Sequence, residues 1–69
     1  MTPLLASLTP REEAVLLLRA EGLGIREVAH RLGITDNAAR KHRDNAVRKS
    51  GRGSEVAAVA ELIRLRAAA

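Results

Sequence analysis

The sequence contains no cysteine and no aromatic residue, and both absences narrow the possible functions. Without cysteine the chain forms neither a disulfide nor a thiolate metal site, which fits a reducing, cytosolic compartment. Without Phe, Tyr or Trp it lacks the side chains on which unpaired bases stack, which excludes the usual single-strand and RNA-binding modules. No apolar run approaches the roughly 20 residues of a membrane span, and the start does not resemble a signal peptide. We therefore expect no membrane partner.

Positive charge is what the chain has in excess. Its 69 residues include 12 Lys and Arg against 8 Asp and Glu, which gives a net charge of +4. The isoelectric point of about 11.1 exceeds the value of about 9 that is typical of nucleic-acid-binding domains. All the cations except Lys41 and Lys49 are arginines, which form forked contacts to phosphate and guanine. One domain of this length buries only about 60% of its unfolded surface, so a partner subunit would help to stabilise it.

Capping and turn residues predict an all-α fold of four helices. Thr9 and Glu12 form a capping box, with Pro10 at the first helical position. Gly33 ends the second helix, and Thr35 caps the third. The four helices are expected over residues 10 to about 21, 25–32, 36 to about 49 and, after a Ser54 cap, 55 to about 66. This leaves a flexible N-terminal arm over residues 1–7, a domain over 8–66 and a tail over 67–69.

The segment from Ile25 to Lys49 carries the functional signal. A short helix, a turn containing Gly33 and a longer basic helix form the helix-turn-helix arrangement, whose second helix enters the DNA major groove. A projection at about 100° per residue places two sets of side chains on opposite sides of that second helix. The set expected to face the core is Ala39, His42, Ala46 and Ser50. The set expected to face solvent or DNA is Asn37, Arg40, Lys41, Asp44 and Arg48.

These motifs and their spacing resemble LuxR/GerE-type DNA-binding domains over roughly Leu8 to Leu65, without a gap. The residues that carry the resemblance are Leu8-Thr9-Pro10-Arg11-Glu12, Val15-Leu16, Ala20-Glu21-Gly22-Leu23, Glu27-Val28-Ala29, Arg31-Leu32-Gly33-Ile34-Thr35, Lys41-His42, Asn45 and Arg48-Lys49.

The resemblance implies a four-helix, helix-turn-helix domain of a bacterial transcription regulator. Such a domain binds double-stranded DNA through its third helix and forms a homodimer through its fourth, in the cytoplasm and associated with the nucleoid. By the family pattern, the side chains that contact bases are Arg40, Lys41 and Asp44. Those that contact phosphates are Thr35, Arg48 and Lys49.

The third helix departs from that family pattern in two ways. Ala38-Ala39 replace the usual Thr-Val, and Ser50 replaces a leucine, which thins the inward side of the helix. Asp44 stands where the family more often has a basic or a small polar residue. It could accept a hydrogen bond from a cytosine amino group. The interpretation we favour is that Asp44 pairs with Arg40 and Arg48, each four residues away.

The fourth helix is apolar over more than half of its circumference, whereas a helix that serves only its own core needs a stripe of about 100°. The excess predicts a second buried surface, and hence a symmetric dimer. The dimer residues expected on this basis are Val59, Leu62, Ile63 and Leu65. Among them we predict that Leu62 faces the partner, because Val59 and Ile63 lie nearer the centre of the arc.

No arrangement for catalysis or metal binding is visible, so we expect neither enzymatic activity nor a cofactor. His30 and His42 lie on different helices without clustered carboxylates, and no serine has a nearby His–carboxylate pair. Two alternatives to a dimeric regulator remain. One is region four of a sigma factor, which shares the helix-turn-helix and binds a promoter element with RNA polymerase. The other is a protein-interaction module that has lost DNA binding.

Overall fold

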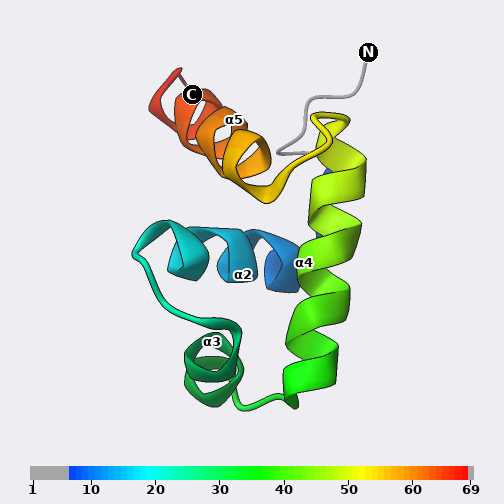
Figure 1. The fold of residues 1–69 in the computed structure, drawn as a ribbon. Coiled ribbons are helices and arrows are strands. Elements are labelled where there is room, and N and C mark those ends of the chain that lie inside the picture. Colours follow the sequence, from blue (N-terminus) through cyan, green and yellow to red (C-terminus); the bar gives the residue numbers. More distant parts are fainter. Residues whose placement is uncertain (1–6, 69) are drawn as a thin grey trace.

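The computed structural model describes residues 7–68, and four α-helices follow one another between residues 10 and 68. They are α2 (Pro10–Ala20), α3 (Ile25–Leu32), α4 (Asp36–Ser50) and α5 (Glu55–Ala68). In Figure 1, α4 stands along one side of the domain, and α2 extends away from it between α3 and α5. The described residues contain no strand, and the all-α prediction is confirmed. None of their helices combines the length and apolar character that crossing a bilayer requires.

Local capping explains why the helix boundaries were predictable. The Thr9 hydroxyl accepts a hydrogen bond from the Glu12 amide (3.1 Å), and the Glu12 carboxylate accepts one from the Thr9 amide (3.0 Å). Gly33 adopts a left-handed φ of +69°, which turns the chain between α3 and α4. The Thr35 hydroxyl then accepts from the Ala38 amide at 3.0 Å. These short-range bonds fix both ends of the turn, so the predicted helix-turn-helix is confirmed.

The main core lies where α2, α4 and α5 meet. Leu16 of α2 and Leu62 of α5 are fully buried there, together with the small side chains of Ala46 and Ala58. Because alanine projects so little beyond the backbone, α4 and α5 can approach the leucines of α2 closely, which compensates for the absence of aromatic side chains. Val28 and Ala29 of α3 are also buried. The inward side of α4 is therefore packed into the core.

The burial of Leu62 corrects one prediction. We expected this side chain to face a partner subunit, but it is fully buried in the core of its own chain. Val59 and Leu65 are half-buried and pack against the same core. Ile63 alone of the four predicted dimer residues is an exposed large side chain, at 47%. The helical projection of α5 could not separate the two apolar sides, because the contact with α2 and α4 decides which one points inward.

The chain ends differ slightly from the predicted domain limits. Of the predicted flexible arm, residues 1–6 lie outside the described residues, and the carbonyl of Ser7 accepts a hydrogen bond from Lys49 at 3.0 Å. At the other end, α5 continues through Ala67 to Ala68. Residue 69 lies outside the described range. The helix α5 thus ends two residues beyond Arg66, where we expected its end.

Candidate nucleic-acid interface

The outward side of α4 is the candidate interface. The predicted outward set is exposed, whereas His42 and Ser50 of the predicted inward set are only half-buried. Ala39 and Ala46 are fully buried against the rest of the domain. The opposite side is exposed along the whole length of the helix. We call this side the α4 outer face; its residues are Asn37, Arg40, Lys41, Asp44 and Arg48.

Two neighbouring helices fix the orientation of the α4 outer face. Both α2 and α3 pack directly against α4. Glu27 caps the start of α3, because its carboxylate accepts a hydrogen bond from the Gly24 amide at 3.3 Å. A 3.7 Å ion pair joins Arg26 of α3 to Asp36 in the first turn of α4. The outer face is therefore presented on a supported helix, which favours recognition of a rigid partner.

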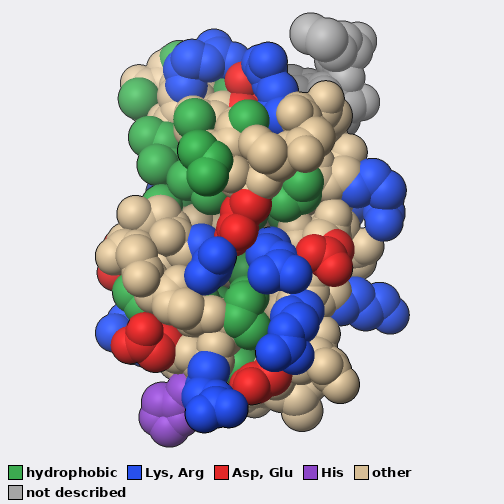
Figure 2. Space-filling view, in the orientation of Figure 1, with side chains coloured by type: hydrophobic (Ala, Val, Ile, Leu, Met, Phe, Trp, Pro, Cys, Tyr) green, Lys and Arg blue, Asp and Glu red, His purple; other side chains and the backbone are tan. Residues whose placement is uncertain are grey.

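Unpaired positive charge is concentrated on the helix-turn-helix. Seven of the 12 Lys and Arg side chains form ion pairs within residues 7–68. The remaining five are Arg11 on α2, Arg31 on α3, and Arg40, Lys41 and Arg48 on α4. Figure 2 shows Lys and Arg side chains gathered over the lower part and the α4 side of the domain, with acidic side chains between them. The cations that remain available to a polyanion thus lie mainly on α3 and α4.

Arg40 is held by a neighbour on the same face. Its Nη1 donates a hydrogen bond to Oδ1 of Asn37 at 3.1 Å, and both residues are exposed. The bond uses one of the five N–H donors of the guanidinium, so the others stay available. The Asn37 amide nitrogen also remains a donor. Together the two residues present a pre-oriented cluster of donors near the start of α4.

The ion pair of Asp44 differs from the predicted one. Its Oδ1 accepts a hydrogen bond from Nε of Arg43 at 3.1 Å, whereas we had expected pairing with Arg40 and Arg48. Arg43 lies at the edge of the outer face, with only 26% of its side chain exposed. The four-residue spacing indicated which side chains could meet, but the carboxylate of Asp44 pairs with the adjacent Arg43 instead. As a result, Arg40 and Arg48 have no carboxylate partner among residues 7–68.

Lys49, at the end of α4, forms an ion pair within the domain. Its Nζ donates to Oε1 of Glu12 at 2.8 Å and to the carbonyl of Ser7 at 3.0 Å. The Glu12 side chain is only 5% exposed. We had placed Lys49 among the phosphate-contacting residues from the family resemblance. The ion pair competes with such a contact, because moving the ammonium to a phosphate would leave the Glu12 carboxylate buried without its cation.

Glu12 stays ionised because of these contacts. Burial alone would raise the pKa of its carboxyl, but the bonds from Lys49 and from the Thr9 amide outweigh burial and lower that pKa below 4.5. A carboxyl whose pKa is lower in the folded state stabilises the fold above the unfolded pKa. This stabilisation is lost as the pH falls through the folded value. The pair therefore links the start of α2 to the end of α4 at neutral pH.

We expect Lys49→Met to lower the free energy of unfolding by about 1–3 kcal/mol at pH 7, because it leaves a buried charge without its main partner. Urea denaturation followed by circular dichroism measures this loss. Lys41→Met is the matched control, since Lys41 is exposed and unpaired; it should change stability by less than about 0.5 kcal/mol. Equal effects of the two substitutions would contradict the assigned role of Lys49. The difference between them should shrink as the pH falls through the lowered pKa of Glu12, because protonation removes the buried charge.

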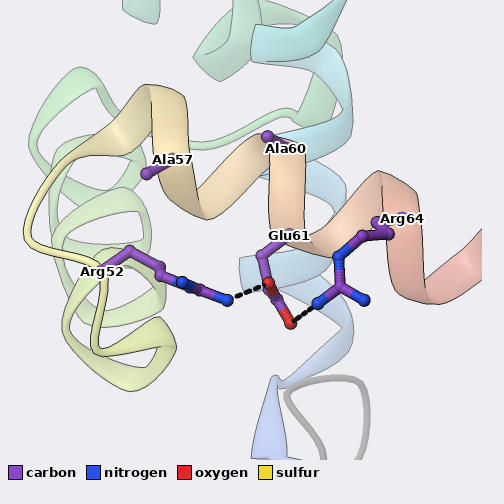
Figure 3. Close-up of a pocket in the computed structure, with 5 residues that line it drawn as sticks. All are labelled: Arg52, Ala57, Ala60, Glu61 and Arg64. Carbon is purple, nitrogen blue, oxygen red and sulfur yellow. Dashed lines mark hydrogen bonds and ion pairs between the residues drawn. The ribbon is translucent and has the colours of Figure 1, made fainter.

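The charges of α5, in contrast, are largely satisfied within the domain. Figure 3 shows Arg52 and Arg64 converging on the carboxylate of Glu61, each at 2.5 Å, beside a shallow pocket floored by Ala57 and Ala60. The hydrogen bond from Arg64 is the main cause that lowers the pKa of Glu61. Arg66 pairs with Glu13 of α2. No unpaired cation remains on α5 within the described residues, so this helix offers no free positive charge to a phosphate.

One further ion pair anchors α5 to α2. Nε and Nη2 of Arg19 donate to the two carboxylate oxygens of Glu55 at 2.5 and 2.9 Å. Another guanidinium nitrogen of Arg19 donates to the carbonyl of Leu23 at 2.8 Å. This forked pair, 36 residues apart in sequence, was not predicted. No local sequence pattern predicts this ion pair, because Arg19 and Glu55 meet only when α5 packs against α2.

The fold and the charged outer face define a helix-turn-helix DNA-binding domain. A comparison with protein families identifies the particular kind: the family model "Sigma-70, region 4" matches residues 3–49, about two thirds of the chain. The chain belongs to this family. No match was found among curated proteins or among solved structures. The matched region includes α2, α3 and almost all of α4, whereas α5 lies beyond it.

Family membership favours the sigma-factor alternative of the sequence analysis over the regulator that we placed first. Both interpretations rest on the same helix-turn-helix, so the DNA-binding class is common to them. The likeness to LuxR/GerE-type domains remains a resemblance carried by residues such as His42 and Asn45.

Proposed function

We propose that this domain binds double-stranded promoter DNA in a sequence-dependent manner, with α4 in the major groove. The observation that carries the proposal is the α4 outer face. This face lies on the second helix of a sigma region 4 helix-turn-helix. It presents three cations that have no carboxylate partner in the described part of the chain, Arg40, Lys41 and Arg48. A major groove about 12 Å wide admits such a helix. The function is binding, without catalysis and without a cofactor.

Roles for the individual residues follow from their positions along α4. Asn37, Arg40 and Lys41 lie in the first two turns, where base contacts concentrate in helix-turn-helix complexes. Arg40 suits guanine, because its free N–H groups can form a forked contact to O6 and N7. Thr35 and Arg48 lie near the two ends of α4 and suit the phosphates on either side of the groove. In the setting of a sigma factor, RNA polymerase would be the protein partner.

Titration of the protein against a random-sequence duplex tests the proposal. Binding by phosphate neutralisation makes the logarithm of affinity fall linearly with the logarithm of salt concentration, with a slope of about −0.9 per phosphate contacted. Three or four contacts would therefore give a slope of about −3. A flat salt dependence, or no binding at low salt, would reject DNA binding and favour a protein-interaction module.

We also propose that α5 can pair with α5 of a second copy, although through residues other than those first expected. Val56 is 81% exposed and Ile63 is 47% exposed. Ala60 and Ala67 are exposed as well. These four residues follow a 4-3-4 spacing, so they line one side of the helix. In a symmetric dimer, a two-fold axis relates the two copies of α4. If their separation matches one helical turn of DNA, they would lie about 34 Å apart.

Ile63→Glu is expected to abolish such pairing without unfolding the chain. The substitution places a charge in the centre of the proposed α5–α5 interface, where burial would leave that charge without a partner. Ala68→Glu, an exposed change outside the 4-3-4 stripe, is the control. Sedimentation equilibrium should show dimers for the wild type and for Ala68→Glu, and monomers for Ile63→Glu. A wild type that stays monomeric, even on duplexes with two sites, would rule out the dimer and leave a monomeric sigma-like module.

A further inference from the structure

Asp44 occupies the middle of the α4 outer face. At about 100° per residue, Asn37 and Arg48 lie only about 20° and 40° from Asp44 around the helix. Its side chain is 67% exposed. If α4 docks as proposed above, this side faces the floor of the groove rather than its phosphate walls. The inference below rests on that proposed function.

Arg43 fixes the orientation of this carboxylate. Its Nε donates to Oδ1 of Asp44 at 3.1 Å, while three quarters of the Arg43 side chain is covered. Arg43 lies close enough to Glu55 to influence it: the bond from Arg19 chiefly lowers the pKa of Glu55, and the charge of Arg43 lowers it further. An arginine that is supported in this way moves less than a free surface side chain. Oδ2 of Asp44 has no donor within residues 7–68, so it remains open to a ligand.

The chemistry of an open carboxylate oxygen restricts what it can meet in the groove. An ionised carboxylate only accepts hydrogen bonds. The major-groove edges of cytosine and adenine carry amino donors at N4 and N6, whereas guanine and thymine present oxygen acceptors. A carboxylate facing O6 or O4 would lose its water without gaining a hydrogen bond, and the partial negative charge of the carbonyl oxygen would repel it. The same negative charge also disfavours close approach to phosphates.

We propose that Asp44, oriented by Arg43, is a specificity-determining residue that selects a cytosine or adenine amino group at one position of the binding site. It does so partly by exclusion, since it weakens binding to duplexes that place an acceptor there. The cations that contact phosphates supply affinity for any duplex, and Asp44 lowers that affinity unless the correct base is present. Arg43 is a positioning residue in this arrangement.

Selection from random duplexes, followed by titration of single-base variants of the enriched site, tests this inference. The wild type should prefer cytosine or adenine at one position by about tenfold to a hundredfold over the base with an acceptor. Asp44→Ala should lose that preference alone and bind random duplex more tightly than the wild type. Asp44→Asn, which has the same shape but adds a donor, should tolerate guanine or thymine at that position.

Glu21→Gln is the control, because it removes the same charge from an exposed residue at the end of α2 remote from α4 (Figure 1). It should keep the preference of the wild type. If the wild type enriches a site and Asp44→Ala retains every base preference, the role of Asp44 is refuted while DNA binding stands. If the wild type enriches no site, sequence-dependent binding itself is refuted, and the role of Asp44 with it.

Discussion

Leu62→Ala is expected to lower the free energy of unfolding by about 2–5 kcal/mol, the range for buried leucines. Leu62 is fully buried between α5 and the rest of the core, in contact with a cluster that includes Leu16 and Ala46. Its partners are helices fixed by their own packing, so the cavity left by truncation should close only in part. A domain of this size is stabilised by only about 3–10 kcal/mol, at about 0.05–0.15 kcal/mol per residue, so the loss would remove a large fraction of the stability.

Urea denaturation followed by circular dichroism measures the loss, with Ile63→Ala as the control. Ile63 lies next to Leu62 in sequence, but it is 47% exposed, so its truncation should cost less than about 1 kcal/mol in a monomer. The comparison also separates the two apolar sides of α5. If Ile63→Ala destabilised the isolated chain more than Leu62→Ala, the orientation of α5 described here would be wrong.

Arg40→Ala is expected to weaken binding to a preferred DNA site by about 1–3 kcal/mol and to relax the base preference at one position. The expectation follows from the place of Arg40 on the outer face and from its bond to Asn37, which pre-orients the guanidinium. Binding to random duplex should weaken much less, since other cations remain to neutralise phosphates.

Arg48→Ala is the matched comparison, because it removes the same charge from the other end of α4. Arg48 is exposed and has no carboxylate partner in the described part of the chain. Its loss should weaken binding to all duplexes alike and reduce the salt slope by about one unit. Fluorescence anisotropy titrations on specific and random duplexes at several salt concentrations give both quantities. Equal losses on both duplexes for both variants would contradict the division between base and phosphate contacts.

The parts of the fold that could be predicted from the sequence are those that short-range interactions determine. The Thr9–Glu12 capping box, the left-handed Gly33 and the Thr35 cap each involve residues within three positions of one another. Their chemistry is complete before any tertiary contact forms. Likewise, the division of α4 into a buried and an exposed side follows from its helical period, since only one side carries small apolar residues.

The parts that could not be predicted depend on contacts distant in sequence. The partner of Lys49 is Glu12, 37 residues away, and the partner of Arg19 is Glu55, 36 residues away. Around α5, apolar side chains are spread over so much of the circumference that either of two sides could have faced inward. Packing against α2 and α4 buries the side with Ala58 and Leu62, and it leaves Val56 and Ile63 outside.

The family assignment met a similar limit. The residues shared with LuxR/GerE-type domains and those expected of sigma region 4 largely coincide in the helix-turn-helix. The apolar fourth helix was the basis for predicting a dimeric regulator, and the family match ends at residue 49, before that helix begins. Sequence patterns therefore identified the DNA-binding class more securely than the kind of transcription protein.

The most direct test of the central claim is a titration of isotopically labelled protein with a duplex of about two helical turns, followed by NMR of the backbone amides. The claim is that the α4 outer face contacts the major groove. It predicts the largest amide shifts at Asn37, Arg40, Lys41 and Asp44, smaller ones near Thr35, and almost none between Ala57 and Arg64 of α5. Shifts concentrated on α5, with α4 unchanged, would contradict the claim.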